Sequence, residues 1–370
     1  MAKYIYENPN WPNFNWDNEK IALLLNDLKL LQAKLLGKMS SLEFEIQEEA
    51  SRIMLENEII KTNEIEGEIF QSEQVRSSIG KKLGIQHLQQ TNKNIDGFVD
   101  LIFDATQNFK QPITTERLFS WHSALFPTGR NGLYKIAVAQ WRKPENEPMQ
   151  VVSGGFGKEK IHFQAPDSAQ IEAEITLFLA YLNYDNTNDL LLKTAIIHLW
   201  FLTIHPFEDG NGRIARIISE YLLSKSDDSV LRFYSLSTQI AKDKKNYYLM
   251  LEKAQKGNLD ISQWIIWFLA TLQKSMVQSD EIIARTLAKA TFWQKNSRTI
   301  LNTRQTKMLN LVWDNFEGNL TTPKWATINK CSGDTALRDI NDLIAKGILF
   351  KEEKGSRSSN YGVVGLKITL

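Results

Sequence analysis

Apolar residues recur every three or four positions along most of this chain, and that spacing predicts a mainly helical fold. In the segment 17–38, for example, Ile21, Leu24, Leu28 and Leu35 would share one face of a helix. The same spacing predicts further helices near residues 41–66, 73–83, 91–107, 114–126, 168–184, 188–205, 213–225, 243–256 and 260–290. Because 370 residues exceed what one ordinary core holds, we expect two or three domains.

One stretch, residues 132–165, interrupts the helical spacing. Two short apolar runs, which contain Val151 and Phe163, flank a turn rich in glycine. The glycines of that turn are Gly154, Gly155 and Gly157. Short apolar runs on either side of such a turn predict a β-hairpin.

The pattern changes again near residue 290, where the predicted elements become shorter. Three helices are expected at residues 304–313, 322–328 and 334–345, then two apolar runs at 347–350 and 361–364 around a polar turn with Gly355 and Ser356. This order resembles a winged helix-turn-helix. We therefore expect a helical N-terminal region over residues 1–90, a helical core over 91–290 and a winged helix-like domain over 291–370.

Charge and composition limit the partners of the chain. The formal net charge of +1 provides no overall attraction to nucleic acid or to a membrane. The most apolar stretch, residues 190–204, is short and contains Lys193 and His198, so it predicts a buried core helix and no membrane span. The first fifteen residues lack the apolar run of a secretory signal, and Cys331 is the single cysteine. We expect a cytoplasmic protein without disulfides.

Residues 205–216 read His-Pro-Phe-Glu-Asp-Gly-Asn-Gly-Arg-Ile-Ala-Arg and contain several chemically active groups. Pro206 disfavours helix at the residue before it, which places His205 at the end of the preceding helix, beside a loop. Gly210 and Gly212 leave the backbone N–H groups at the start of the next helix accessible. Such N–H groups, at the positive end of a helix dipole, form an anion site.

Two arginines, Arg213 and Arg216, follow within the predicted first turn of that helix, on the side away from its apolar face. The helix dipole disfavours cations there, and a bound anion would reverse that cost. Together with the loop, the arginines therefore predict a phosphate site. Asp209 could hold a divalent metal beside the phosphates, and His205 could accept a proton near neutral pH. The chain has no G-x-x-x-x-G-K-[ST] loop, so the site is not a P-loop.

These residues match, at every fixed position, the motif H-x-F-x-[DE]-G-N-G-R-x-x-R of the Fic family, and the similarity extends over residues 60–290. The chain thus resembles protein adenylyltransferases, which move AMP from ATP to a hydroxyl side chain of a target protein. The resemblance implies a mainly α fold, with a Fic helical core and a β-hairpin flap. It also implies ATP as the substrate and Mg²⁺ as the metal.

The resemblance assigns a role to each residue of the loop. His205 would be the general base that deprotonates the Ser, Thr or Tyr hydroxyl of the target. Asp209 would bind Mg²⁺. The side chain of Asn211 and the backbone of Gly210 and Gly212 would stabilise charge on the α-phosphate.

The arginines would bind the remaining phosphates, with Arg213 near the β-phosphate and Arg216 on the γ-phosphate. Phe207 would anchor the loop in the core. A branch of the family that transfers phosphate has lysine in place of the second motif glycine. This chain keeps Gly212 there, which favours nucleotidyl transfer.

Two further parts of the match concern the nucleoside and the target protein. Tyr248 and Gln255 resemble positions that contact the nucleoside. The hairpin at about 148–165 resembles the flap on which the target segment docks. A target can add to the edge of such a hairpin through main-chain hydrogen bonds, and Val151 and Val152 are the candidate residues.

A second motif lies upstream, where residues 62–67 fit the family's inhibitory pattern [ST]-x-x-x-E-[GN] with Thr62, Glu66 and Gly67 at its fixed positions. Glu66 is expected at a helix C-terminus, where an acidic residue opposes the dipole unless a cation meets it. By resemblance that cation is Arg216, so that Glu66 would block the γ-phosphate site. The chain therefore resembles the class inhibited by its own N-terminal helix.

Other interpretations stay open at this stage. In some relatives the inhibitory glutamate assists removal of AMP, so a deAMPylase or a bifunctional enzyme is the nearest alternative. A regulator that binds DNA through residues 291–370 is an alternative of another class. We expect a protein-docking role there instead, because acidic residues interleave with the basic ones and leave no basic stripe. Those basic residues are Arg338, Lys346, Lys351, Lys354 and Arg357. A homo-oligomer is also compatible with the sequence.

Several residues near the motifs are interpreted as structural. His198 is expected to support the site or the core, and Glu208 to be a solvated loop carboxylate. The aromatic residues between positions 4 and 16 are expected to pack on a neighbouring surface. The other histidines show no metal-binding spacing, and they are His87, His122 and His162.

Overall fold

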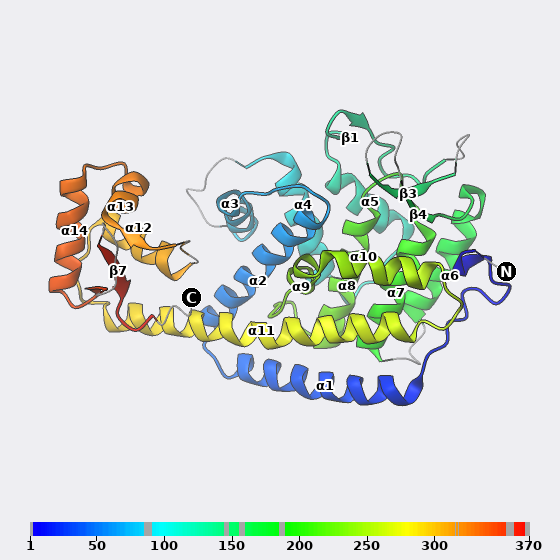
Figure 1. Ribbon diagram of the computed structural model, residues 1–370, viewed down its shortest axis with the longest axis horizontal. Helices are drawn as coiled ribbons and strands as arrows, with labels where there is room; N and C mark the ends of the chain where they lie inside the picture. Colours follow the sequence, from blue (N-terminus) through cyan, green and yellow to red (C-terminus); the bar gives the residue numbers. More distant parts are fainter. Residues whose placement is uncertain are drawn as a thin grey trace. The chain divides into compact units, whose positions relative to one another are not determined.

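The structure is a computed structural model that describes residues 3–84, 91–143, 148–154, 160–184, 189–314, 316, 318–352 and 359–366. It divides into two compact units, Met1–Asp280 and Glu281–Leu370. Both are built mainly of helices, as the apolar spacing predicts (Figure 1). No helix among the described residues has the length and apolarity that crossing a bilayer requires.

The first unit contains all the elements that surround the motifs. Its helices are α1 (Asn18–Ser40), α2 (Phe44–Ile65), α3 (Ser72–Lys82), α4 (Lys93–Gln107), α5 (Thr115–Leu125), α6 (Ile171–Tyr184), α7 (Leu190–Ile204), α8 (Asn211–Asp227), α9 (Leu236–Lys242), α10 (Lys244–Gln255) and α11 (Ser262–Lys295), the last continuing into the second unit. Its strands are β1 (Arg130–Asn131), β2 (Tyr134–Lys135), β3 (Gln150–Ser153) and β4 (Lys160–Gln164), and two 3₁₀ turns are η1 (Ile5–Glu7) and η2 (Ser168–Gln170). Each helix predicted from the spacing is present, and α9 is an addition whose seven residues are too few to display a period.

Helix α7 lies at the centre of this unit. Every residue from Leu191 to Ile204 is buried, which explains why the sequence is apolar on all sides here. Helix α8 packs along α7, and α2, α4 and α5 contact α8 in turn. The loop that joins α7 to α8, residues 205–210, is therefore held at both ends by buried helices.

The N-terminal region runs alongside the core. The backbone N–H of Asp17, before α1, donates to Ser262 Oγ at the start of α11, at 2.8 Å. Lys38 near the end of α1 pairs with Asp280 at 2.7 Å. The two helices thus lie side by side and run in the same direction (Figure 1).

The aromatic segment before α1 packs against the hairpin. Tyr4 is buried and its ring lies 5.3 Å from that of Phe163 on β4, edge to face. Tyr6 stacks on Tyr4 and also meets Phe163, at 5.7 and 6.0 Å between ring centroids. The expectation that these aromatics pack on a neighbouring surface is confirmed. For Tyr4 and Tyr6 that surface is one face of β3 and β4, whereas Trp11 and Phe14 pack edge to face on Trp200 of α7.

Strands β3 and β4 form the hairpin predicted from the sequence. They pair antiparallel, with an irregularity in register between Val151 and Val152. The turn residues Gly155 and Gly157 lie outside the described residues.

The second unit consists of α12 (Thr303–Trp313), β5 (Leu320–Thr321), α13 (Thr322–Asn329), α14 (Gly333–Ala345), β6 (Leu349–Lys351) and β7 (Asn360–Val363). Its strands form one antiparallel sheet in the order β5-β7-β6. Met308, Trp325, Ile340 and Leu343 bring the three helices together in its core. The three helices and two strands predicted from the sequence are present, and the assignment to the winged helix class stays a prediction. Gly355 and Ser356 lie outside the described residues.

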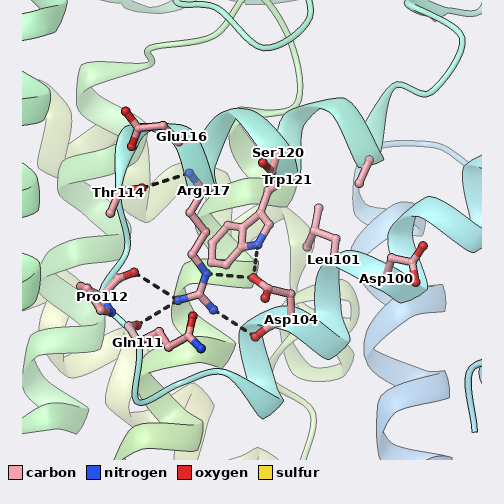
Figure 2. A pocket seen from close by; sticks show the side chains of 11 residues that line it. Asp100, Leu101, Asp104, Gln111, Pro112, Thr114, Glu116, Arg117, Ser120 and Trp121 are labelled. Atoms are coloured by element: carbon pink, nitrogen blue, oxygen red, sulfur yellow. Dashed lines mark hydrogen bonds and ion pairs between the residues drawn. The ribbon is translucent and has the colours of Figure 1, made fainter.

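A hollow of about 600 Å³ lies beside α4 and α5 in the first unit (Figure 2). The guanidinium of Arg117 occupies its wall and donates to the Asp104 carboxylate and to the backbone oxygens of Asp104, Asn108, Gln111 and Pro112. All five N–H groups of the arginine are thereby used. Trp121 donates to the same carboxylate at 2.7 Å. This cluster fastens α4 to α5 and offers no free donor to a ligand.

Candidate active site

His205 terminates α7 in a left-handed backbone conformation, with φ 50° and ψ 59°. Such a conformation is uncommon for a residue other than glycine, and it turns the chain sharply into the loop. Arg142 fixes the turn, because its backbone N–H donates to Pro206 O at 2.9 Å and its Nε donates to His205 O at 2.8 Å. The same guanidinium donates to Pro166 O, so both ends of the hairpin segment are tied to His205.

The imidazole of His205 is in its neutral form near pH 7. Burial lowers its pKa to about 4, and the nearby Arg142 cation acts in the same direction. The carbonyl of Leu202 and the charges of Asp209 and Glu66 offset only part of this. A neutral imidazole can accept a proton, which is what a general base requires.

Asn211 closes the loop between the two helices. Its side-chain amide donates to Phe207 O at 2.8 Å, and its side-chain oxygen accepts from Phe207 N at 3.0 Å. Phe207 is fully buried, as the sequence predicts, and lies flat on the ring of His122 at 4.1 Å. The structure therefore places the Asn211 side chain on the loop backbone, a holding function that the sequence did not indicate.

His122 supports the loop from α5. Its Nδ1 accepts from the backbone N–H of Ala139, so the proton resides on Nε2, which donates to Asp209 O at 3.2 Å. Burial lowers the pKa of this fully enclosed imidazole to about 4, so it stays neutral. From the sequence His122 was only a histidine without metal spacing. Glu208, expected to be solvated, accepts instead from Ala137 N at 2.9 Å and braces the same segment.

Asp209 presents a carboxylate at the rim of the loop. One oxygen accepts from the side chain of Asn131 at 2.6 Å and the other from the N–H of Gly210 at 2.5 Å. Its side chain is 33% exposed, and the described residues contain no group of three or more His, Cys, Asp or Glu suited to a metal. A single accessible carboxylate fits Mg²⁺ in the manner usual at nucleotide sites, where substrate phosphates and waters complete the shell.

Helix α8 begins at Asn211, capped by Gly210 with φ 81°. A side chain at Gly210 would also meet Leu125 and Phe126 within 3 Å, so glycine is required there. This start corrects one expectation, because Arg216 falls in the second turn of the helix. Arg213 and Arg216 are 3% and 1% exposed, so neither points to solvent away from the apolar face. They can be buried because each is paired.

Arg216 is held by the end of α2. Its Nε donates to Thr62 Oγ1 at 2.6 Å, and its Nη2 donates to Thr62 O at 3.0 Å and to Glu66 Oε1 at 2.6 Å. Burial alone would lower the pKa of Arg216, but the Glu66 carboxylate raises it above its ordinary value. A Cβ added at Gly212 would lie 2.3 Å from Glu66 Oε1, so this carboxylate sits directly on the first turn of α8.

Arg213 is paired with a residue that the sequence reasoning missed. Its Nη1 donates to Glu68 Oε1 at 2.6 Å, and Asp209 Oδ1 lies 3.9 Å from its Nη2. Gly67, between the two glutamates, has φ 85° and ends α2. Two nitrogens, Nε of Arg213 and Nη1 of Arg216, are buried without a hydrogen-bond partner among the described residues. Buried donors without partners are rare, and a ligand or water that accepts hydrogen bonds would account for them.

Behind Arg216 lies a buried polar chain. Ser219 donates to Ala215 O, so it accepts from His198 Nδ1, and His198 Nε2 accepts from the hydroxyl of Tyr247, both at 2.9 Å. Burial, with the charge of Arg216, lowers the pKa of His198 to about 3. The expected supporting role of His198 is thus confirmed as a contact between α7, α8 and α10.

The residues proposed for the nucleoside and the target lie on α10 and the hairpin. Tyr248 is 39% exposed, and burial with the charge of Glu66 raises its pKa to about 12. Gln255 is buried instead and donates to Leu202 O at 3.2 Å. On β3, Val152 is exposed, whereas Val151 packs on the aromatic cluster of the N-terminal segment.

A short polar chain joins the hairpin to α10. His162 Nε2 lies 2.6 Å from Ser153 Oγ across the hairpin, and its Nδ1 lies 2.6 Å from Glu252 Oε2. Hydrogen bonds from Lys256 and then from His162 lower the pKa of Glu252 to about 2. The carboxylate is therefore ionised, and the chain links β3, β4 and α10.

Comparison with known proteins finds two sequence models that each match a part of this chain. Residues 112–223 match the sequence model of the Fic/DOC family, and residues 4–85 match that of a domain of unknown function, DUF4172. A probable protein adenylyltransferase of Aquifex aeolicus is 28% identical over 95 residues. That match covers 26% of this chain and 27% of the relative's length.

Two solved structures share the fold. A Fic family protein from Desulfovibrio desulfuricans has a TM-score of 0.52 at 17% identity, covering 93% of this chain and 97% of that one. A Fic domain containing signaling protein from Bacteroides thetaiotaomicron has a TM-score of 0.52 at 16% identity, covering 70% of this chain and 96% of that one. The helical core described above is therefore a Fic fold.

Proposed function

We propose that this chain, which carries a Fic/DOC family domain at residues 112–223, is a protein adenylyltransferase held inactive by Glu66. One arrangement carries the proposal. A neutral His205 stands at one end of a short loop, and the N-terminus of α8 with the buried Arg216 stands at the other. A base beside an anion site is what transfer of a phosphorus group to a hydroxyl needs. The name of the Aquifex relative supports AMP as the group transferred.

The reaction proceeds by displacement at the α-phosphorus of ATP. The hydroxyl of the target protein gives its proton to the imidazole of His205 while its oxygen attacks the α-phosphorus. The bond from that phosphorus to the oxygen bridging to the β-phosphate breaks, and pyrophosphate leaves. The phosphate charge that arrives with ATP opposes the charge of Arg142 and raises the basicity of His205 toward neutral pH.

The phosphates bind at the start of α8. The N–H groups of Gly212 and its neighbours and the positive end of the helix dipole attract the anion. Arg213 and Arg216 provide the charge and the parallel donors that phosphate oxygens accept. Asp209 would hold Mg²⁺, which neutralises part of the phosphate charge when bound.

Glu66 inhibits because it occupies the place of a phosphate. Its carboxylate lies on the first turn of α8 and takes a hydrogen bond from Arg216. ATP that arrives with Glu66 in place loses this arginine, and its phosphates are displaced from the line of attack. The target protein docks along β3 at Val151 and Val152, where main-chain hydrogen bonds can fix its register.

The test uses ATP labelled at the α-phosphate, Mg²⁺ and three forms of the full chain: wild type, Glu66→Gly, and Glu66→Gly with His205→Ala. Label is followed into the protein itself and into a cell lysate. Weak labelling by the wild type, strong labelling by the single variant and none by the double variant would support the proposal.

Two outcomes would contradict it. If Glu66→Gly gains nothing while the wild type strips AMP from a premodified target, the glutamate serves hydrolysis and the chain is a deAMPylase. If no form transfers or removes label, the site does not use ATP for adenylylation.

A further inference from the structure

The two arginines of the phosphate site are each paired with a carboxylate from the same short segment. Arg216 donates to Glu66 and Arg213 donates to Glu68, both at 2.6 Å. We propose that Glu68 is a second blocking carboxylate, and that the site opens fully to a polyphosphate only when Glu66 and Glu68 both leave. This inference rests on the function proposed above and names a further residue that controls its substrate site.

The turn at Gly67 positions both acids. After Glu66 the N–H of Gly67 donates to Glu64 O and the N–H of Glu68 donates to Asn63 O, at 3.0 and 2.9 Å. This is the Schellman arrangement, in which a left-handed residue reverses the chain at a helix end. Gly67 supplies the left-handed residue with φ 85°. The glutamates on either side of it therefore face the same helix, α8.

In each pair the two side chains differ in their exposure to solvent. The arginines are 3% and 1% exposed, whereas the side chains of Glu68 and Glu66 are 30% and 28% exposed. The carboxylates thus lie toward solvent and the guanidinium groups lie beneath them. An anion that arrives from solvent meets both acids before it meets either arginine.

The arginines keep donors for such an anion. Nε of Arg213 and Nη1 of Arg216 are buried without partners among the described residues. Removal of either glutamate would leave a buried cation without its counter-charge, which is unfavourable until an anion replaces it. Asp209 lies 3.9 Å from Arg213 and repels that anion unless a cation covers it.

The geometry also indicates the class of ligand. Arg213 and Arg216 are three residues apart on α8 and so lie on neighbouring positions of one helix face. A ligand with two adjacent anionic groups, such as a nucleoside di- or triphosphate, can replace both glutamates. A single phosphate group can replace only one of them.

The probe for this inference is inorganic tripolyphosphate, whose binding is measured by calorimetry with Mg²⁺ present. The full chain is compared with Glu66→Gln, Glu68→Gln, the double variant, and Glu64→Gln as control. Glu64 is on the same helix end but pairs with Lys61 at the surface. We expect each single variant at positions 66 and 68 to bind about tenfold more tightly and the double variant about a hundredfold, since a charged hydrogen bond is lost each time. The control should match the wild type.

The results separate this inference from the proposed function. If Glu68→Gln binds as the wild type does and adds nothing to Glu66→Gln, Glu68 does not block the site, even where Glu66→Gly activates AMP transfer. If both glutamine variants bind more tightly and no form transfers AMP, the inference stands and the proposed function fails.

Thermal unfolding identifies a variant that has lost its fold. In that case Gly67→Ala gives a second test, because nothing lies within 4 Å of the added methyl and only the backbone turn is strained. Tighter tripolyphosphate binding by Gly67→Ala would support the inference, and unchanged binding would oppose it.

Discussion

At the scale of single residues, His205 combines a chemical role with a backbone role, and the two can be separated. Alanine would remove the imidazole and also disfavour the left-handed backbone at φ 50°. Asparagine tolerates that backbone and cannot act as a base. We therefore expect His205→Asn, in the Glu66→Gly background, to lose about 10²- to 10⁴-fold in AMP transfer while its melting temperature stays close to that of the parent.

The measurement is transfer of α-labelled AMP, with tripolyphosphate binding as the control for an intact phosphate site. Transfer within a few-fold of the parent would show that His205 is not the base. Equal loss of transfer and of binding would indicate that the substitution disturbs the loop.

The buried histidines make stability depend on pH. His122 and His198 have folded-state pKa values lowered to about 4 and about 3, against an ordinary value of 6.5. Above pH 6.5 neither state binds the proton. Below pH 6.5 the imidazoles bind a proton in the unfolded state but not in the folded state. The free energy of unfolding therefore falls as the pH drops from 6.5 toward 4.

Each histidine should contribute a loss of about 2 kcal/mol between pH 7.5 and pH 5. Urea unfolding at the two pH values measures the total loss for the wild type. His122→Gln and His198→Gln should each show a smaller loss than the wild type. A loss of equal size in all three proteins would contradict the assignment of neutral, buried imidazoles.

The residues that the sequence left out share one property, which is that their partners lie far along the chain. Glu68 meets Arg213, His122 meets Asp209, and Asn131 meets the same aspartate. Periodicity and motif spacing describe neighbours in sequence and carry no information on such contacts. For Glu68 a local signal did exist. Gly67 ends the helix, and the turn that it forms fixes the position of the residue after it as well as that of Glu66 before it.

At the scale of elements, the chain Ser153–His162–Glu252 joins the hairpin to the helix that carries Tyr248. If the hairpin presents the target, its attachment to α10 sets the position of the target relative to the nucleotide. We expect His162→Phe to raise the KM for the protein target several-fold and to leave the KM for ATP unchanged, in the Glu66→Gly background.

Lys256→Met is the matched control, because Lys256 binds the other oxygen of Glu252 from the same end of the chain, one helical turn further on. Limited proteolysis gives a readout independent of activity, since a detached hairpin should be cut faster. Equal changes in both KM values, or the same effect from Lys256→Met, would contradict a positioning role for His162.

Elements were predictable where burial repeats with a local period. The apolar face of α1 follows directly from its spacing, the buried α7 from its continuous apolar run, and the hairpin from its glycine turn. The burial of Arg213 and Arg216 was not predictable in that way. Their burial depends on carboxylates that α2 and the turn after it bring to α8. Helical spacing alone predicts that an arginine, as a polar residue, lies on the exposed side.

At the scale of the whole molecule, the N-terminal region reaches the site from two sides. Tyr4 and Tyr6 pack on Phe163 of the hairpin, and Glu66 and Glu68 pair with the arginines of α8. Both contacts come from residues that match the domain of unknown function over positions 4–85. One region therefore touches the part proposed to present the target and the part proposed to bind phosphates. A partner that displaces this region could alter both at once.

The charges of the second unit bear on the two roles considered for it. Binding to duplex DNA requires unpaired basic side chains gathered on one face. Here Arg304 pairs with Asp339 at 2.7 Å and Lys346 with Asp342 at 2.5 Å, and the net charge of the chain is only +1. Two of the basic residues considered from the sequence, Lys354 and Arg357, lie outside the described residues.

We therefore expect the full chain to bind a labelled random-sequence duplex no more tightly than about 10⁻⁴ M at 50 mM salt, the weak end of non-specific binding. Fluorescence anisotropy at 50 and 200 mM salt measures this, with single-stranded DNA of the same length as a control for stacking. A protein that released several counterions would instead lose affinity steeply between the two salt concentrations. Tight binding that weakens steeply with salt would show that the second unit binds DNA. Weak binding would support docking of a protein, the role that the paired charges favour.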